Sequence, residues 1–430
     1  MTETLQEPQP MNPTDTIATS VWRTKETPLV PGSPRGPLRG ESVAVKDVFA
    51  VAGEPIGAGN PLRLAQQPAQ PRHAAAVQAL ITAGADLTGI TQADEFAWSM
   101  SGTNAHYGTP PNPAAPGRIS GGSSNGSASA VALGEATVGL GTDTSGSVRV
   151  PAAYQGLWGI RTTLGLIPTT GVQPLAQSFD TVGWFTRTPE LLSRVAQAVI
   201  PAPKKVAPTA PSALGGMGTG SIPAVPKGPV AWEADRPLGE LRVLPDLFSL
   251  ADDDVAAACR RLLTQLEAGA GGSVAIQCPG QQELQEWRGV FSTILSREAW
   301  ANHGQWVSAH WEAMTPEVGA RFRAARDYTD EDEAAARTRH SSIRETIRGW
   351  VGDGVLALPS AATVAPLLES ADGADSLRQR HLLLTMLGSL AGLPVVNVPT
   401  LTDDGLPTGL SLMGPSGSDK ALIAYAAQLA

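Results

Sequence analysis

Three residues of this chain have the types needed for an activated nucleophile that uses no histidine. Ser123 and Ser147 lie 24 residues apart in a stretch rich in glycine and serine, and an isolated Lys46 precedes them on an expected strand. A serine hydroxyl becomes reactive when a neighbouring base takes its proton, and a neutral lysine can be that base. Taken singly, a strand lysine is usually a solvated charge, and a serine in a glycine-rich turn usually stabilises the turn.

Both serines lie in the stretch GGSSNGSASAVALGEATVGLGTDTSGSVRVP, from Gly121 to Pro151. Its glycine and serine clusters alternate with apolar segments, whereas a linker would stay polar and unpatterned. One cluster leads into an expected helix and the other follows an expected strand, where backbone N–H groups can bind an anion or oxyanion. The stretch lacks a P-loop, a GxGxxG fingerprint and a GxSxG elbow, which disfavours phosphate, dinucleotide and α/β-hydrolase sites.

Strands and helices alternate around these clusters and must position them. Alternation of this kind is typical of an α/β fold, here a mixed, largely parallel central β-sheet covered by helices on both faces. Period-two patterns and short apolar runs predict strands over 41–49, 86–92, 136–143, 354–362 and 393–400. Helical patterns predict helices over 73–84, 127–136, 250–270, 296–314, 329–351 and 375–393.

The composition is that of an ordinary globular protein and disfavours several classes of partner. The chain has 430 residues, 42% of them apolar and 17% charged, so it can bury a large core. Its net charge of −9 has interspersed signs, which gives neither nucleic acid nor an anionic membrane a basic patch. No apolar run reaches the length of a membrane span and no signal peptide is recognisable, so we expect a cytoplasmic protein. A homodimer is an open alternative to a monomer.

Two weakly patterned segments suggest how the chain is organised. Residues 1–20 lack periodicity and are expected to be a disordered tail, and residues 201–229 are rich in proline and glycine. Because no repeat or independent motif follows, residues 21–430 are interpreted as one domain with a long loop at 201–229, rather than as two domains. Cys259 and Cys278 have no metal-ligand spacing, so neither a metal site nor a cofactor is expected.

Three motifs resemble those of the amidase signature family. GGSSNGSA (121–128) is similar to the family's GGSSGGSA, GTDTSGSVRVPA (141–152) to its GTDxGGSxRxPA, and VAVKD (43–47) to its lysine strand. The order and spacing of the two serines and the lysine are also similar. The resemblance covers most of the chain except the first 20 residues and about 200–350. Within the family, the chain looks most like the short indole-3-acetamide hydrolases of plants and their bacterial relatives.

The resemblance implies a role for each of these residues. Ser147 would attack an amide carbonyl to form an acyl-enzyme and release ammonia or an amine. Ser123, after a cis bond from Gly122, would pass the proton from Ser147 to Lys46. An oxyanion hole would be formed by the backbone N–H groups of Thr144, Ser145, Gly146 and Ser147.

Lys46 can act as a base only where its pKa falls from about 10.4 to near 7 or 8, which a buried strand position can supply. Strand alternation places Lys46 on the face opposite Val43 and Val45 and turns Asp47 away from the amine. The acid next in sequence is therefore not expected to hold the lysine charged.

Other positions in the motifs are expected to support the site. Thr142, Asp143 and Arg149 are interpreted as residues that brace the loop by hydrogen bonds. Ser145 and Asn125 stand where many family members have glycine, which adopts unusual backbone angles more freely.

Four residues are candidates for the wall of the substrate pocket. Ala97 matches a family position whose backbone carbonyl can approach the nucleophile. His106 is interpreted as structural or substrate-lining, because the resemblance supplies a complete triad without it. Met100 and Trp184 are assigned to the core or to the pocket wall.

Three functions remain open. The first is a free-standing amidase for small, partly apolar or aryl-substituted carboxamides, such as indole-3-acetamide, with carbamates and urea-like amides also compatible. The second is the ammonia-supplying subunit of a tRNA-dependent amidotransferase, which usually reads GSDTGGSIRQPA where this chain reads GTDTSGSVRVPA. The third is a non-catalytic binding module like the amidase-like receptor of chloroplast protein import, but such proteins lose triad residues that this chain keeps.

Overall fold

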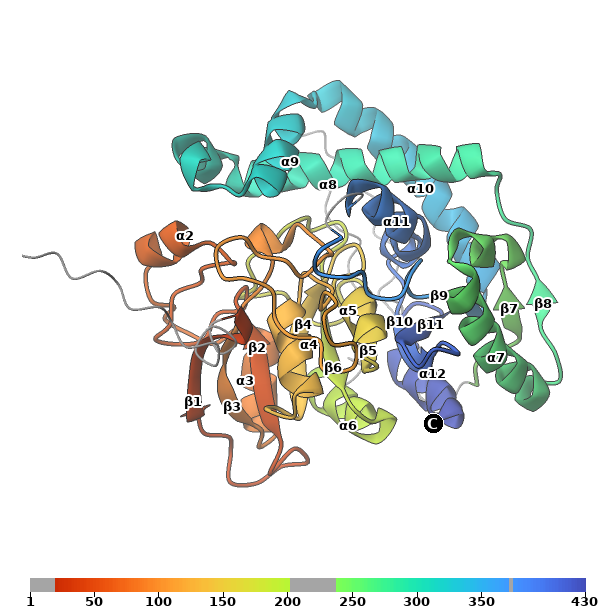
Figure 1. Ribbon diagram of the computed structural model, residues 1–430, viewed down its shortest axis with the longest axis horizontal. Helices are drawn as coiled ribbons and strands as arrows, with labels where there is room; N and C mark the ends of the chain where they lie inside the picture. Colours follow the sequence, from red (N-terminus) through yellow and green to blue (C-terminus); the bar gives the residue numbers. More distant parts are fainter. Residues whose placement is uncertain (1–19, 202–236, 371–373) are drawn as a thin grey trace, which may run out of the picture.

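A single mixed β-sheet forms the centre of the molecule in the computed structural model, which describes residues 20–201, 237–370 and 374–430 (Figure 1). The described strands follow the order β1-β3-β2-β4-β6-β5-β10-β11-β9-β7-β8. Apart from Ser20 and Pro201, the expected tail and the proline- and glycine-rich loop lie outside the described residues. The strands are β1 (Trp22–Val30), β2 (Ser42–Lys46), β3 (Asp86–Thr91), β4 (Val138–Asp143), β5 (Trp158–Arg161), β6 (Thr181–Thr186), β7 (Leu241–Val243), β8 (Val274–Ala275), β9 (Val355–Pro359), β10 (Val395–Leu401) and β11 (Pro407–Met413).

The α/β fold with a mixed sheet is confirmed, but the expected predominance of parallel strands is wrong. Among the described strands, six neighbouring pairs are antiparallel and four are parallel. The parallel pairs join β2 to β3 and β4, and β7 to β8 and β9. In the centre, β10 and β11 are connected by a tight turn, and a short connection of this kind suffices only for antiparallel strands.

Helices cover both faces of the sheet, as expected. One face packs against α3, α6, α7 and α12, and the other against α4, α5 and a layer formed by α8 to α11 (Figure 1). Within the described residues, no helix combines the length and the apolar character needed to cross a membrane. The helices are α2 (Pro61–Gln66), α3 (Ala75–Thr82), α4 (Asn125–Ala132), α5 (Arg149–Tyr154), α6 (Pro189–Val199), α7 (Asp253–Ala270), α8 (Gln281–Ala309), α9 (Pro316–Asp327), α10 (Asp330–Val351), α11 (Ala374–Ala391) and α12 (Asp419–Ala426).

Adjacent residues of β6 show how the strands divide the core. Trp184 points into the cluster beneath α6, and Phe185 points into the cluster formed with α4 and α5. Trp184 is completely buried, and its indole N–H donates a hydrogen bond to the carbonyl oxygen of Leu192 in α6 (3.2 Å). Trp184 is therefore a core residue, the first of the two alternatives that the sequence left open, and it does not take the other place, in the wall of the substrate pocket.

Replacing Trp184 with alanine should lower the free energy of unfolding by about 3–5 kcal/mol, because the change removes a large buried side chain and leaves a cavity. Urea denaturation would measure this loss. Leu401→Ala is the matched control, since Leu401 is 55% exposed and its change should alter stability by less than about 0.5 kcal/mol. Equal midpoints for Trp184→Ala and wild type would contradict the core assignment.

Candidate active site

Lys46 is the last residue of β2, and its side chain is completely buried. Its Nζ lies 2.8 Å from the hydroxyl oxygen of Ser123 and 2.9 Å from that of Thr142, which is carried by the neighbouring strand β4. Asp47 points elsewhere, as strand alternation predicts, and accepts a hydrogen bond from the N–H of Gly57 (3.1 Å). The structure therefore brings the lysine and the first serine of the predicted triad into direct contact.

Burial changes the acid–base character of Lys46. Loss of hydration lowers the pKa of its amine from 10.5 to about 7, because a charged amine is poorly solvated in the interior. The negative charges of Asp94, Asp143 and Asp180 oppose this shift. With a pKa near 7, a large fraction of Lys46 is neutral near neutral pH, which is the form that can accept a proton.

Ser123 stands just before α4, after a peptide bond from Gly122 that is cis, as the resemblance implies. The N–H of Gly122 donates to the carbonyl oxygen of Met100 (2.9 Å), and the carbonyl oxygen of Ser123 accepts a hydrogen bond from the N–H of Asp94 (3.2 Å). The N–H of Ser124 donates to the carbonyl oxygen of Ser147 (3.3 Å). These contacts tie the segment of the first serine to the segment of the second.

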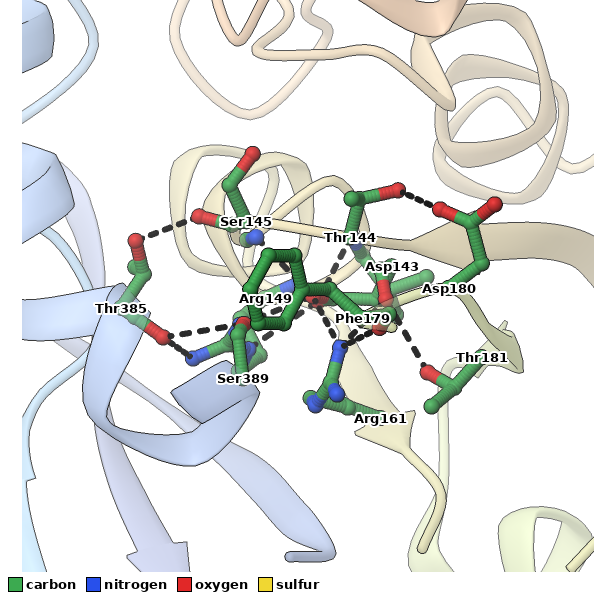
Figure 2. Close-up of polar contacts among 12 residues, drawn as sticks. Asp143, Thr144, Ser145, Arg149, Arg161, Phe179, Asp180, Thr181, Thr385 and Ser389 are labelled. Carbon is green, nitrogen blue, oxygen red and sulfur yellow. Dashed lines mark hydrogen bonds and ion pairs between the residues drawn. The ribbon is translucent and has the colours of Figure 1, made fainter. Parts of the chain in front are cut away.

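Asp143 ends β4 and organises the loop that carries Ser147. Its carboxylate accepts hydrogen bonds from the backbone N–H groups of Gly146 (2.9 Å) and Val148 (3.1 Å). It also accepts two from the guanidinium of Arg149, at 3.0 and 2.8 Å, and forms an ion pair with Arg161 (Figure 2). These partners hold the pKa of the Asp143 carboxyl far below its usual value despite its burial. The prediction that Asp143 and Arg149 brace this loop is confirmed.

Two other segments fix the outer side of the same loop. The hydroxyl of Thr144 donates to a carboxylate oxygen of Asp180 (2.6 Å), and the hydroxyl of Thr385 in α11 donates to the carbonyl oxygen of Ser145 (Figure 2). Arg149 in turn donates to the carbonyl oxygen of Thr385 (2.7 Å). The loop is therefore held by the sheet, by the segment before β6 and by α11.

The predicted oxyanion hole loses one of its four donors. The N–H of Gly146 is already bound to Asp143, which leaves those of Thr144, Ser145 and Ser147 as candidates. Gly146 has a φ of +126°, and a Cβ there would lie 3.0 Å from the side chain of Thr385. Ser145 has no such positive φ, so a serine fits where many family members have glycine.

Ser147 is buried two residues before α5. Among the hydrogen bonds within the described residues, none engages its hydroxyl group. The structure therefore places Ser123 in contact with Lys46 but does not join the hydroxyl of Ser147 to that of Ser123 by a hydrogen bond.

A pocket of about 560 Å³ lies beside the segment of Ser123, although no residue of the predicted triad lines it. Its wall includes Met100, whose carbonyl oxygen accepts the hydrogen bond from Gly122, and also Tyr154 and His381, which the motifs did not single out. Among the groups of histidine, cysteine and acidic side chains in the described residues, none could hold a metal ion. The largest part of the wall is apolar, formed by Met100, Ile119, Pro366, Leu367, Leu368 and Leu377.

Comparison with known proteins identifies the family of the chain. The family model described as Amidase matches residues 16–423. The chain belongs to the amidase family. It is accordingly a hydrolase of carbon–nitrogen bonds in linear amides, other than peptide bonds.

This amidase resembles both curated relatives and solved structures. It is 34% identical to "Amidase 1" of Oryza sativa subsp. japonica, over 91% of this chain and 90% of the relative. It is 29% identical to a glutamyl-tRNA(Gln) amidotransferase subunit of Halobacterium salinarum, over 93% and 96% of the two chains. A solved structure titled "Crystal structure of amidase" superposes with a TM-score of 0.75 at 29% identity, covering 92% of this chain and 85% of the other.

Besides Trp184, two other predicted lining residues of the amidase lie outside this pocket. Ala97 is buried in a short 3-10 turn with a φ of +57°. His106 contacts Glu95 through its Nε2 (3.0 Å), and Glu95 also binds the backbone N–H and hydroxyl of Thr315. His106 therefore belongs to a polar cluster that connects to the segment before α9, which agrees with the structural interpretation of this residue.

Lys46→Met should stabilise the amidase most at low pH. Between pH 7 and 10.5 the unfolded chain holds a proton on Lys46 that the folded protein has lost, so wild-type stability rises with pH across this window. Below pH 7 the folded protein bears the full cost of burying the charge, on the order of 5 kcal/mol. We expect the variant's advantage in chemical denaturation to be largest below pH 7 and to vanish toward pH 10.5.

The matched control is Lys25→Met, because Lys25 is an exposed lysine paired with Glu135 on the surface. Lys25→Met removes a positive charge without relieving its burial, so it should not show the gain in stability at low pH that is expected of Lys46→Met. A stability difference for Lys46→Met that does not change with pH would contradict the lowered pKa of Lys46.

Proposed function

We propose that this amidase hydrolyses a small, partly apolar or aryl-substituted carboxamide to the acid and ammonia through an acyl-enzyme on Ser147. The observation that carries the proposal is the contact between the buried amine of Lys46 and the hydroxyl of Ser123. A lysine with a pKa near 7 is matched to proton transfer at neutral pH. Family membership supports hydrolysis of an amide, while the triad and the acyl group are parts of the proposal.

In the proposed reaction, neutral Lys46 takes the proton of Ser123 as Ser123 takes that of Ser147. The oxygen of Ser147 forms a bond to the amide carbon, and the carbonyl oxygen becomes an oxyanion. The proton then returns along the same path to the amide nitrogen, the C–N bond breaks and ammonia leaves. Water, deprotonated by the same pair, attacks the acyl-enzyme; the ester bond breaks, the proton passes back to the oxygen of Ser147, and the acid leaves.

The oxyanion would be stabilised by the N–H groups of Thr144, Ser145 and Ser147, which the loop contacts hold in place. Loss of one such donor typically costs about 3–4 kcal/mol of transition-state stabilisation. Fixed donors need no reorganisation as charge develops, because the carboxylate of Asp143 and the hydroxyl of Thr385 already hold this loop. The pocket lined by Met100 and Tyr154, with its largely apolar wall, supports an acyl group with substantial apolar area.

The second candidate is the ammonia-supplying subunit of a tRNA-dependent amidotransferase, and similarity to the glutamyl-tRNA(Gln) amidotransferase chain of Halobacterium salinarum favours keeping it. Carbamates and urea-type amides are compatible with the same centre. The binding-module alternative is disfavoured because Lys46, Ser123 and Ser147 are all present.

We further propose one domain over residues 21–430, a cytoplasmic location and, as an alternative to a monomer, a homodimer.

Ammonia release by the purified chain should disappear in Ser147→Ala and fall by several orders of magnitude in Ser123→Ala. The first change removes the nucleophile and the second removes its link to the base. A panel of indole-3-acetamide, phenylacetamide, aliphatic amides and carbamates would identify the class of acyl group. Ser342→Ala, which changes an exposed serine on α10, is the control. Hydrolysis that appears only with glutamine and a partner chain would instead support the amidotransferase subunit.

The pH dependence of kcat/KM should show an acid limb with an apparent pKa near 7. Below this pH Lys46 is protonated and cannot take the proton of Ser123, so activity should fall tenfold for each further pH unit. Asp94→Asn should move the limb to lower pH, because Asp94 is the acid that most opposes the lowered pKa. A wild-type limb near pH 4 would rule out Lys46 as the base.

A further inference from the structure

Tyr154 lies where the apolar pocket meets the catalytic segments. It ends α5 and lines the pocket, and its ring packs so closely on Gly121 that a Cβ there would lie 3.0 Å from the ring. His381 of α11 lies directly against Tyr154, and Thr385, one turn further along the same helix, binds the carbonyl oxygen of Ser145. The pocket wall at Tyr154 is therefore linked through α11 to the loop that carries the proposed nucleophile.

The protons of His381 can be assigned from its partners. Its Nδ1 lies 2.8 Å from the carbonyl oxygen of Leu377, which can only accept, so Nδ1 carries the proton. Burial lowers the pKa of His381 to about 4, so the ring is neutral and its Nε2 is an acceptor. The hydroxyl of Tyr154 lies 2.8 Å from Nε2 and must donate its one proton there.

No other proton in the described surroundings is directed to the Tyr154 oxygen. The hydroxyl of Thr363 is 3.3 Å away, but its proton is donated to the carbonyl oxygen of Val364 at the shorter distance of 2.7 Å. The phenol oxygen of Tyr154 is therefore a hydrogen-bond acceptor, because its own proton is donated to Nε2 of His381. A buried acceptor in an apolar wall is stabilised when a ligand supplies the missing donor.

We propose that Tyr154 is a specificity-determining residue that selects acyl groups bearing an N–H or O–H donor on an apolar frame. The inference rests on the proposed function, since it concerns the acyl pocket of that reaction. Frames such as indole or phenol fit this chemistry, because they combine a large apolar area with one donor. At the position next to the Tyr154 oxygen, a carboxylate or carbonyl oxygen of the ligand is disfavoured, because two acceptors would meet there.

The test compares indole-3-acetamide with benzothiophene-3-acetamide, which has a similar shape but no N–H. Wild type should prefer the indole substrate by up to about tenfold in kcat/KM, the size expected for one hydrogen bond. Tyr154→Phe should abolish this preference, mainly through KM, so that the ratio of the two kcat/KM values falls to about one. Tyr425→Phe, which changes a half-buried tyrosine on α12, is the matched control and should keep the preference.

A second pair of variants tests the proton assignment. His381→Leu removes the acceptor for the Tyr154 proton, so the phenol can rotate and donate, and the preference for indole should fall. His381→Gln supplies a side-chain oxygen near the position of Nε2 and should restore part of it. Circular dichroism and thermal melting would show that each variant folds.

Several outcomes would overturn the proposal. One is an equal loss for both substrates in Tyr154→Phe, and another is a wild type that shows no preference between them. Hydrolysis of other amides but of neither member of the pair would also overturn it and leave the proposed function intact. Failure of wild type to hydrolyse any amide in the panel would instead count against the proposed function itself.

Discussion

The buried carboxylate of Asp143 is the contact on which the catalytic loop depends. It accepts hydrogen bonds from three backbone N–H groups and contacts two guanidinium groups. The backbone carbonyl oxygen of Asp143 accepts hydrogen bonds from Arg161 and from Thr181 (Figure 2). Because the C=O and N–H of a trans peptide point in opposite directions, fixing this carbonyl also fixes the direction of the N–H of Thr144. Removing the carboxylate would leave Arg149 and Arg161 as uncompensated buried charges, a change that typically costs about 3–5 kcal/mol.

The interior that contains Asp143 also contains Lys46, which must lose its positive charge before it can act as a base. Asp143 is surrounded by donors and stays ionised, whereas burial raises the pKa values of Asp94 and Asp180 to about 6. Their negative charges are therefore partly lost in mildly acidic solution, the condition under which they would otherwise favour protonation of Lys46. Burial of Lys46 by the strands on either side outweighs the attraction of all three acids, and this balance is what suits the amine to act as a base.

Local sequence patterns predicted those features that depend on near neighbours. Strand alternation placed Lys46 and Asp47 on opposite sides, and the helices over 73–84, 250–270 and 329–351 follow their apolar periods. The patterns did not show which partner a group would find in the folded chain. Trp184 belongs to the core because α6 covers it, and the N–H of Gly146 is taken by Asp143. The excess of antiparallel strands likewise depends on which strands pair, which the pattern of a single strand does not determine.

The sequence did not predict Tyr154 and His381 as residues of the pocket wall, because their contact forms only in the folded protein. Tyr154 and His381 are 227 residues apart, and only the docking of α11 against α5 makes them a hydrogen-bonded pair. The docking also serves the catalytic loop, because Thr385 follows His381 by one turn and binds the carbonyl oxygen of Ser145. The peptide unit between Ser145 and Gly146 is thereby held at its oxygen by α11 and at its N–H by Asp143. Any movement of α11 as a ligand enters the pocket would thus bear directly on the loop that carries the proposed nucleophile.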